Sequence, residues 1–104
     1  MSFVEAFKTE ELANGEMRSK VLSGKSVAVA HVGDSFFAFD DTCTHRQCSL
    51  SEGFLEDGVV ECPCHGGKFN IKTGEILAMP PVVPLPVYPV KVENGIIYVE
   101  VSFS

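Results

Sequence analysis

The chain has 104 residues and a mass of 11.3 kDa, which is enough for one domain and excludes an enzyme with separate cofactor and substrate domains. Hydrophobic residues make up 45% of the sequence and charged residues 21%, so we expect a packed core rather than a disordered chain. The formal charge is -6, from 14 acidic and 8 basic residues, and this is the wrong sign for a protein that binds the phosphate backbone of nucleic acid.

The N-terminal segment, residues 1–14, has no basic stretch followed by an apolar one. We therefore expect neither a secretory signal nor a membrane anchor, and a cytoplasmic location. The one helix that the sequence predicts is a turn or so around Thr9 to Asn14, with Thr9 as its N-cap. Later in the chain, the longest uncharged run, Ile76 to Val90, contains five prolines, so no membrane-spanning helix is expected there either.

Short apolar segments bounded by turn residues dominate the rest of the sequence and predict β-strands. In chain order these segments are 27–32, 36–39, 59–62, 68–71, 90–93 and 96–101. The turns between them contain Gly33-Asp34, Asp57-Gly58, Thr73-Gly74 and Asn94-Gly95, and Asn-Gly is a strong signal for a two-residue hairpin. The pattern predicts an all-β fold of antiparallel hairpins.

All four cysteines and two of the three histidines lie between positions 42 and 67. They form two mixed motifs, Cys43-x-His45 and Cys62-x-x-His65, each of which offers a thiolate and an imidazole. The 16 residues between the motifs are enough for a hairpin through Asp57-Gly58 that returns the second motif beside the first. The two motifs are therefore expected to surround one metal centre.

Two kinds of centre use two thiolates and two imidazoles. Zinc takes all four ligands tetrahedrally, whereas a [2Fe-2S] cluster takes the thiolates on one iron and the imidazoles on the other. Structural zinc sites usually pair motifs of one ligand type, and the mixed motifs here are unusual for them. This favours the cluster without excluding zinc.

The two motifs, Cys43-Thr-His45 and Cys62-Pro-Cys64-His65-Gly66, resemble the ligand loops of the Rieske iron-sulfur proteins. The similarity extends through Thr73-Gly74 and the proline segment after Met79. Within that group the chain most resembles the ferredoxins of bacterial ring-hydroxylating dioxygenases. The resemblance implies one domain over residues 1–104, with a base of residues 1–40 and 82–104 and an inserted cluster-binding subdomain of residues 41–81.

The resemblance also implies a role for each ligand residue. Cys43 and Cys62 would bind the inner iron, and His45 and His65 the outer iron, of one [2Fe-2S] cluster per chain. Around the cluster, Gly66 and Gly67 lack a Cβ, which lets their backbone amides approach the cluster sulfurs. Pro80 would cover a further side of the cluster.

The chain combines one feature that is unlike the dioxygenase ferredoxins with another that is unlike the respiratory and photosynthetic Rieske subunits. In those subunits the positions of Cys48 and Cys64 form a disulfide between the ligand loops, whereas dioxygenase ferredoxins typically lack both cysteines. The same subunits usually carry Ser and Tyr where this chain has Gly67 and Phe69. Our hypothesis is a Cys48–Cys64 disulfide that braces the loops, and a reduction potential in the lower part of the Rieske range.

The function implied by the resemblance is one-electron transfer from an NAD(P)H-dependent flavin reductase to the terminal oxygenase of an aromatic-ring-hydroxylating dioxygenase. The sequence shows no nucleophile–base pair of its own, so we do not expect an enzyme. A carrier that visits two partners in turn is expected to be a monomer. Two alternatives are a subunit of another reductase, such as the nitrite reductase small subunit, and a structural zinc module.

Overall fold

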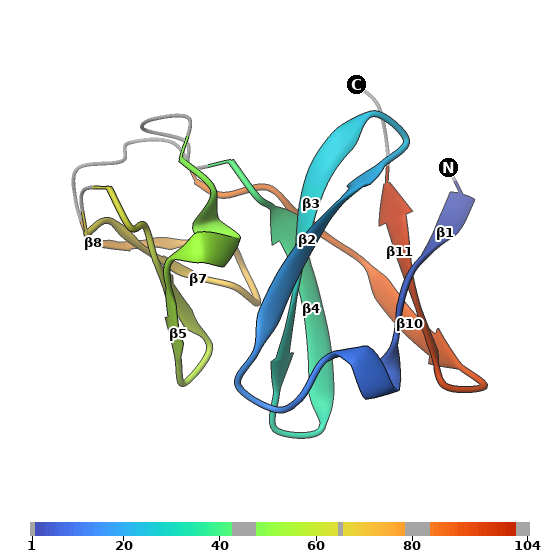
Figure 1. Ribbon diagram of the computed structural model, residues 1–104. Coiled ribbons are helices and arrows are strands. Elements are labelled where there is room, and N and C mark those ends of the chain that lie inside the picture. The colour runs from blue at the N-terminus through green and yellow to red at the C-terminus, as the bar shows by residue number, and fades with distance from the viewer. Residues whose placement is uncertain (1, 43–47, 65, 79–83, 102–104) are drawn as a thin grey trace.

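Three antiparallel sheets lie side by side in this computed structural model, which describes residues 2–42, 48–64, 66–78 and 84–101 (Figure 1). The strand orders are β1–β11–β10, β2–β3–β4–β9 and β5–β6–β7–β8. The strands are β1 (Ser2–Lys8), β2 (Met17–Leu22), β3 (Lys25–Val32), β4 (Ser35–Asp40), β5 (Phe54–Glu56), β6 (Val59–Glu61), β7 (Lys68–Asn70), β8 (Ile76–Ala78), β9 (Val87–Tyr88), β10 (Val90–Glu93) and β11 (Ile96–Val101). The all-β prediction is confirmed.

The middle sheet is buried on both faces, and strand β3 shows why. Val27 and Val29 pack into one core with β1 and β11, whereas Ala28 and Ala30 pack into a second core with the β5–β8 sheet. All four side chains are fully buried. Successive side chains of a strand point to opposite faces, so an unbroken apolar run is what a strand between two cores requires.

The second core joins the third sheet to the rest of the molecule. Val60 and Phe69 contribute to it from β6 and β7, and Phe39 contributes from β4. Each of these side chains has no measurable exposure. Burying an aliphatic or aromatic side chain stabilises the fold by about 1.5–3 kcal/mol, so this core fixes the third sheet against β3 and β4.

The predicted hairpin turns are present where the chain needs positive φ. Asp57 and Gly58, between β5 and β6, have φ of 50° and 79°, and Asn94 and Gly95, between β10 and β11, have φ of 52° and 75°. Two consecutive residues of positive φ match the right-handed twist of the flanking strands. The hairpin between the two motifs is therefore confirmed.

The predicted helix at Thr9 to Asn14 is wrong in type and extent. The chain makes a single 3-10 turn, η1 (Thr9–Glu11), with Lys8 rather than Thr9 as its N-cap. The Thr9 amide donates to the Gly95 carbonyl at 2.9 Å, so it serves the neighbouring hairpin. The fully buried Leu12 follows directly after η1 in an extended conformation, which ends the turn.

The two ends of the described chain meet in one sheet, because β1 pairs with β11 along its whole length (Figure 1). The third sheet, in contrast, is built entirely from residues 54–78. Among the described residues, no helix is long and apolar enough to cross a membrane.

Candidate metal centre

The structure places one of the four predicted ligands. Cys62 follows directly after β6, and its side chain is only 1% exposed. Three other predicted ligands, Cys43, His45 and His65, lie outside the described residues, as does Pro80. The ligand set thus stays a prediction for those positions, and the described residues around them define the setting of the site.

A tight turn links Cys62 to the two glycines that follow the second motif. The Gly66 amide donates to the Cys62 carbonyl at 3.1 Å, and the Cys62 amide donates to the Gly67 carbonyl at 2.8 Å. Gly66 has φ of +74°, a region that side chains with a Cβ rarely adopt. Both hydrogen bonds fix the ends of the second ligand loop, so the loop is presented on a rigid strand end.

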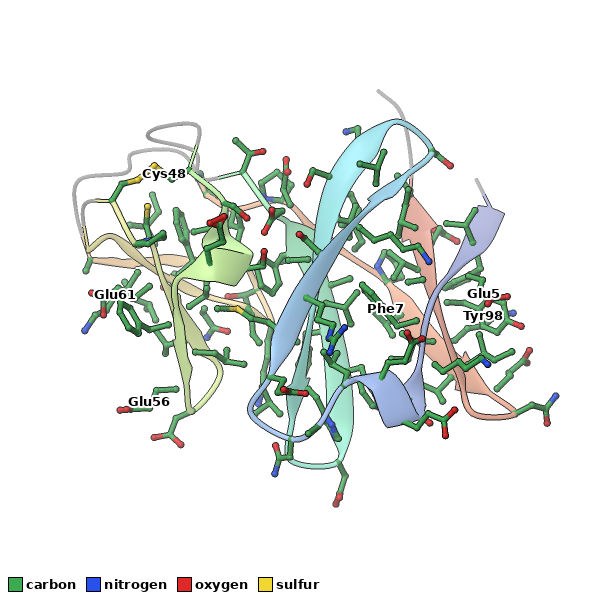
Figure 2. The ribbon with its side chains drawn as sticks, in the orientation of Figure 1. Glu5, Phe7, Cys48, Glu56, Glu61 and Tyr98 are labelled. Atoms are coloured by element: carbon green, nitrogen blue, oxygen red, sulfur yellow. A yellow bond between two sulfur atoms is a disulfide. The ribbon has the colours of Figure 1, made fainter. Side chains whose placement is uncertain are left out.

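Cys48 and Cys64 are joined by a disulfide, with their Cα atoms 6.5 Å apart (Figure 2). This bond connects the end of the first predicted ligand loop to the second loop. The Sγ atoms of Cys48, Cys62 and Cys64 all lie within 4.8 Å of one another. The disulfide sulfurs are not thiolates, so Cys62 is the one of these three that suits a metal.

The described donor set fits an iron-sulfur cluster. Cys62 offers a buried thiol, in contact with the second core and shielded from water. No described residue crowds the backbone at Gly66, because the nearest described atom to a Cβ there would be a Glu61 carboxylate oxygen at 3.7 Å. A buried thiolate beside an uncovered backbone is the setting in which amides approach cluster sulfurs.

A buried carboxylate, that of Asp41, forms hydrogen bonds with residues that follow the first ligand loop and with strand β3. Asp41 is 4% exposed, and its carboxylate accepts hydrogen bonds from the Ser51 amide at 2.8 Å, the Ser49 hydroxyl, and the Ser26 hydroxyl at 3.4 Å. The Asp41 carbonyl also accepts from the Leu50 amide at 2.6 Å. Asp41 thereby ties both sides of the loop to strand β3.

Asp41 is the site residue that sequence reasoning missed. The signal for it was weak: the second of two Asp residues that follow a predicted strand, and serines after the second cysteine. Only the folded chain brings Ser26, from another strand, to the same carboxylate. His31, in contrast, has a structural role, since its Nδ1 lies 2.9 Å from the Leu12 carbonyl and its ring stacks on Phe36.

Comparison with known proteins adds three findings. Residues 2–89 match the family described as "Rieske [2Fe-2S] domain". The 3-phenylpropionate/cinnamic acid dioxygenase ferredoxin subunit of Photorhabdus laumondii is 45% identical over 98% of this chain and 97% of its own length. The biphenyl dioxygenase ferredoxin subunit of Pseudomonas sp. strain KKS102 is 41% identical over 98% of this chain and 94% of its own.

The fold is also similar to a solved structure. A chain from the complex of reduced oxygenase and oxidized ferredoxin in carbazole 1,9a-dioxygenase superposes with a TM-score of 0.88. It is 42% identical, and the similarity covers 93% of the present chain and all of the other.

Proposed function

The chain belongs to the Rieske [2Fe-2S] domain family, and on that premise we propose that Cys43 and Cys62 hold one iron and His45 and His65 the other. The family match decides between the two cofactors that the ligand spacing alone left open. The cluster accepts a single electron and gives it up again. The protein is an electron-carrying ferredoxin component rather than an enzyme, as its relatives are.

The chain's own residues support this role through rigidity and exclusion of water. Cys62 is held at a strand end by its own amide and carbonyl hydrogen bonds, and its side chain is buried. The disulfide and the Asp41 network restrain the first loop from two sides. A ligand cage that moves little between oxidation states favours fast electron transfer. The observation that carries the proposal is the buried Cys62, which is fixed by two backbone hydrogen bonds beside the Cys48–Cys64 disulfide.

The partners belong to the same proposal. The relatives are named as subunits of dioxygenases, and the solved relative was captured with an oxygenase. We place this protein between an NAD(P)H-dependent flavin reductase and the terminal oxygenase of an aromatic-ring-hydroxylating system, as a monomer. A cytoplasmic location fits a reductase that draws on NAD(P)H.

Anaerobic stopped-flow spectroscopy tests the function. The oxidised protein is mixed with NADH and a flavin reductase of a dioxygenase system, and then with the oxygenase of the cinnamic acid, biphenyl or carbazole system. We expect the visible absorption of the cluster to bleach on reduction and to return as the oxygenase takes the electron. The Cys62→Ser variant, which lacks one proposed ligand, is the control. Reduction by the reductase without reoxidation by any of the three oxygenases would contradict the proposal.

A further inference from the structure

One face of the β5–β8 sheet is core, and the described side chains on the other face are exposed or half-buried. Leu55, Val60 and Phe69 point into the second core. Because side chains alternate along a strand, their neighbours point outwards. In register, Phe54 of β5 lies opposite Glu61 of β6, and Glu61 lies opposite Lys68 of β7. This outward side, which we call the outer face, lies away from β3 and β4 (Figure 2).

The outer face exposes large apolar side chains. Phe54 is 65% exposed and Leu77, from β8, is 47% exposed. They sit on the two edge strands, and Val59 lies between them on β6. Together these side chains help to line a shallow hollow of about 600 Å³. Single exposed apolar residues are normal on a protein surface. A large Phe and a large Leu that line the same hollow are more typical of a surface that binds another molecule.

The rim of the hollow is acidic. Glu56, Asp57 and Glu61 line it, against one base, Lys68. Among the described residues the one ion pair is Lys91–Glu93, on a different sheet, so none of these carboxylates forms a close ion pair with a described residue, although Lys68 lies opposite Glu61 in register. Figure 2 shows Glu56 and Glu61 on the same side of the sheet. Three carboxylates against one lysine give the lining a net negative charge, and together with the exposed apolar side chains this complements a basic surface that carries an apolar side chain.

The outer face is continuous with the second ligand loop. Glu61 is the last residue of β6 and Cys62 is the next residue in the chain. The Glu61 carboxylate lies 3.7 Å from the place a Cβ would take on Gly66. A partner seated on the outer face therefore also reaches the loop that carries the cluster ligands.

We infer that the outer face, with Phe54 and Leu77 at its centre, docks the terminal oxygenase. The inference rests on the proposed function and adds the surface and the chemistry of the partner: a basic oxygenase face that places an apolar side chain in the hollow. The acidic rim steers the approach, and the apolar centre sets the lifetime of the complex.

The apolar centre is tested by Phe54→Ser/Leu77→Ser in the cluster-loaded protein. Both side chains face solvent, so the cores stay intact. The matched control is Val21→Ser, since Val21 is 68% exposed on β2 of another sheet. Dissociation constants are measured by titration into the cinnamic acid, biphenyl and carbazole oxygenases. We expect affinity to fall about tenfold or more for the double variant and to change less than about twofold for the control.

The acidic rim is tested by Glu56→Lys, with Glu10→Lys on η1 as the control of equal charge change. We expect Glu56→Lys alone to slow association and to weaken its dependence on salt concentration. The rate of reduction by the flavin reductase is measured in parallel for every variant, and it should match that of the unmodified protein.

Three results overturn the inference. Unchanged oxygenase affinity in the Phe54→Ser/Leu77→Ser variant would show that the outer face is not the docking surface. An equal loss toward the reductase would show that it does not belong to the oxygenase. If the unmodified protein binds none of the three oxygenases, the proposed function fails and the inference with it, a result that is visible before any variant is made.

Discussion

Asp41 is buried without a described basic partner, and its carboxylate is satisfied by hydrogen-bond donors alone. We expect Asp41→Asn to lower the free energy of unfolding by about 1–3 kcal/mol. The reason is that an amide keeps one acceptor oxygen but turns a donor group toward hydrogen-bond donors. Urea unfolding of the cluster-loaded protein measures the change.

The neighbouring residue provides the control for this prediction. Asp40 accepts one long hydrogen bond, from the Thr42 amide at 3.3 Å, at an exposed position. Asp40→Asn should therefore change the free energy of unfolding by less than about 0.5 kcal/mol. Equal stability of the two variants would show that the Asp41 network does not hold the loop.

The reduction potential is the second prediction at the scale of single residues. Gly67 and Phe69 carry no hydroxyl group, so neither can donate a side-chain hydrogen bond to the cluster or its ligands. We expect a midpoint in the lower half of the Rieske range of roughly -150 to +300 mV. Redox titration measures it, and a midpoint near the upper limit would refute the role given to the missing hydroxyl groups.

Residue types and their spacing predicted a metal centre, and the resemblance to Rieske proteins predicted its kind, but neither predicted the hydrogen bonds that support it. Cys62 was found because thiolate and imidazole at fixed spacing have few other uses. The resemblance to the respiratory and photosynthetic Rieske subunits led to the Cys48–Cys64 pairing that the structure contains. Asp41 was not found, because its donors come from a strand and a turn that only the folded chain brings together.

At the scale of elements, each predicted segment corresponds to a strand, but β1 and β2 were missed although they have seven and six residues, and three short strands were missed as well. The segments 90–93 and 96–101 coincide with β10 and β11. Strands β5, β8 and β9 have two or three residues each and were not predicted, whereas the equally short β6 and β7 were. Their positions are set by pairing with β6, β7 and β4, a tertiary effect.

Gly74 anchors the segment that returns from the third sheet. Its φ is +83°, and its carbonyl accepts from the Leu85 amide at 2.8 Å. A Cβ at Gly74 would collide with the Leu85 backbone, whereas at Gly24, with φ of +82°, a Cβ would meet nothing within 4 Å. Gly24→Ala should lower the free energy of unfolding by about 1–2 kcal/mol, because of its backbone conformation alone. Gly74→Ala should lower it by at least twice as much. Equal losses in thermal unfolding would contradict this close approach.

Strand β9 gives the fold a dependence on alkaline pH. Burial, and secondly the negative charge of Asp40, raise the pKa of Tyr88 above its ordinary value. A raised pKa means that the folded state prefers the neutral phenol. The corresponding stability is complete below about pH 10 and is lost as the pH rises further.

Tyr88→Phe removes the group that titrates and tests this pH dependence. Above about pH 10 the free energy of unfolding should fall less steeply in Tyr88→Phe than in the unmodified protein. If the free energy of unfolding falls equally steeply with pH in Tyr88→Phe and in the unmodified protein, Tyr88 is not the source of the pH dependence.

At the scale of the whole molecule, the three sheets have different roles. The sheet formed by both ends of the chain and the middle sheet enclose the first core, and the third sheet extends from the second core to carry the ligand loop (Figure 1). The first two sheets and their core thus lie on one side of the molecule, and the second ligand loop and the outer face lie on the other. This arrangement suits a carrier that must release one partner before it meets the next.

The central claim, one iron held by two thiolates and the other by two imidazoles, is tested most directly by pulsed electron paramagnetic resonance of the dithionite-reduced protein. The account predicts a signal from a [2Fe-2S] cluster with hyperfine coupling to two histidine nitrogens, one each from His45 and His65. A signal with no nitrogen coupling would contradict it. So would a protein that gives no cluster signal and contains zinc in place of iron.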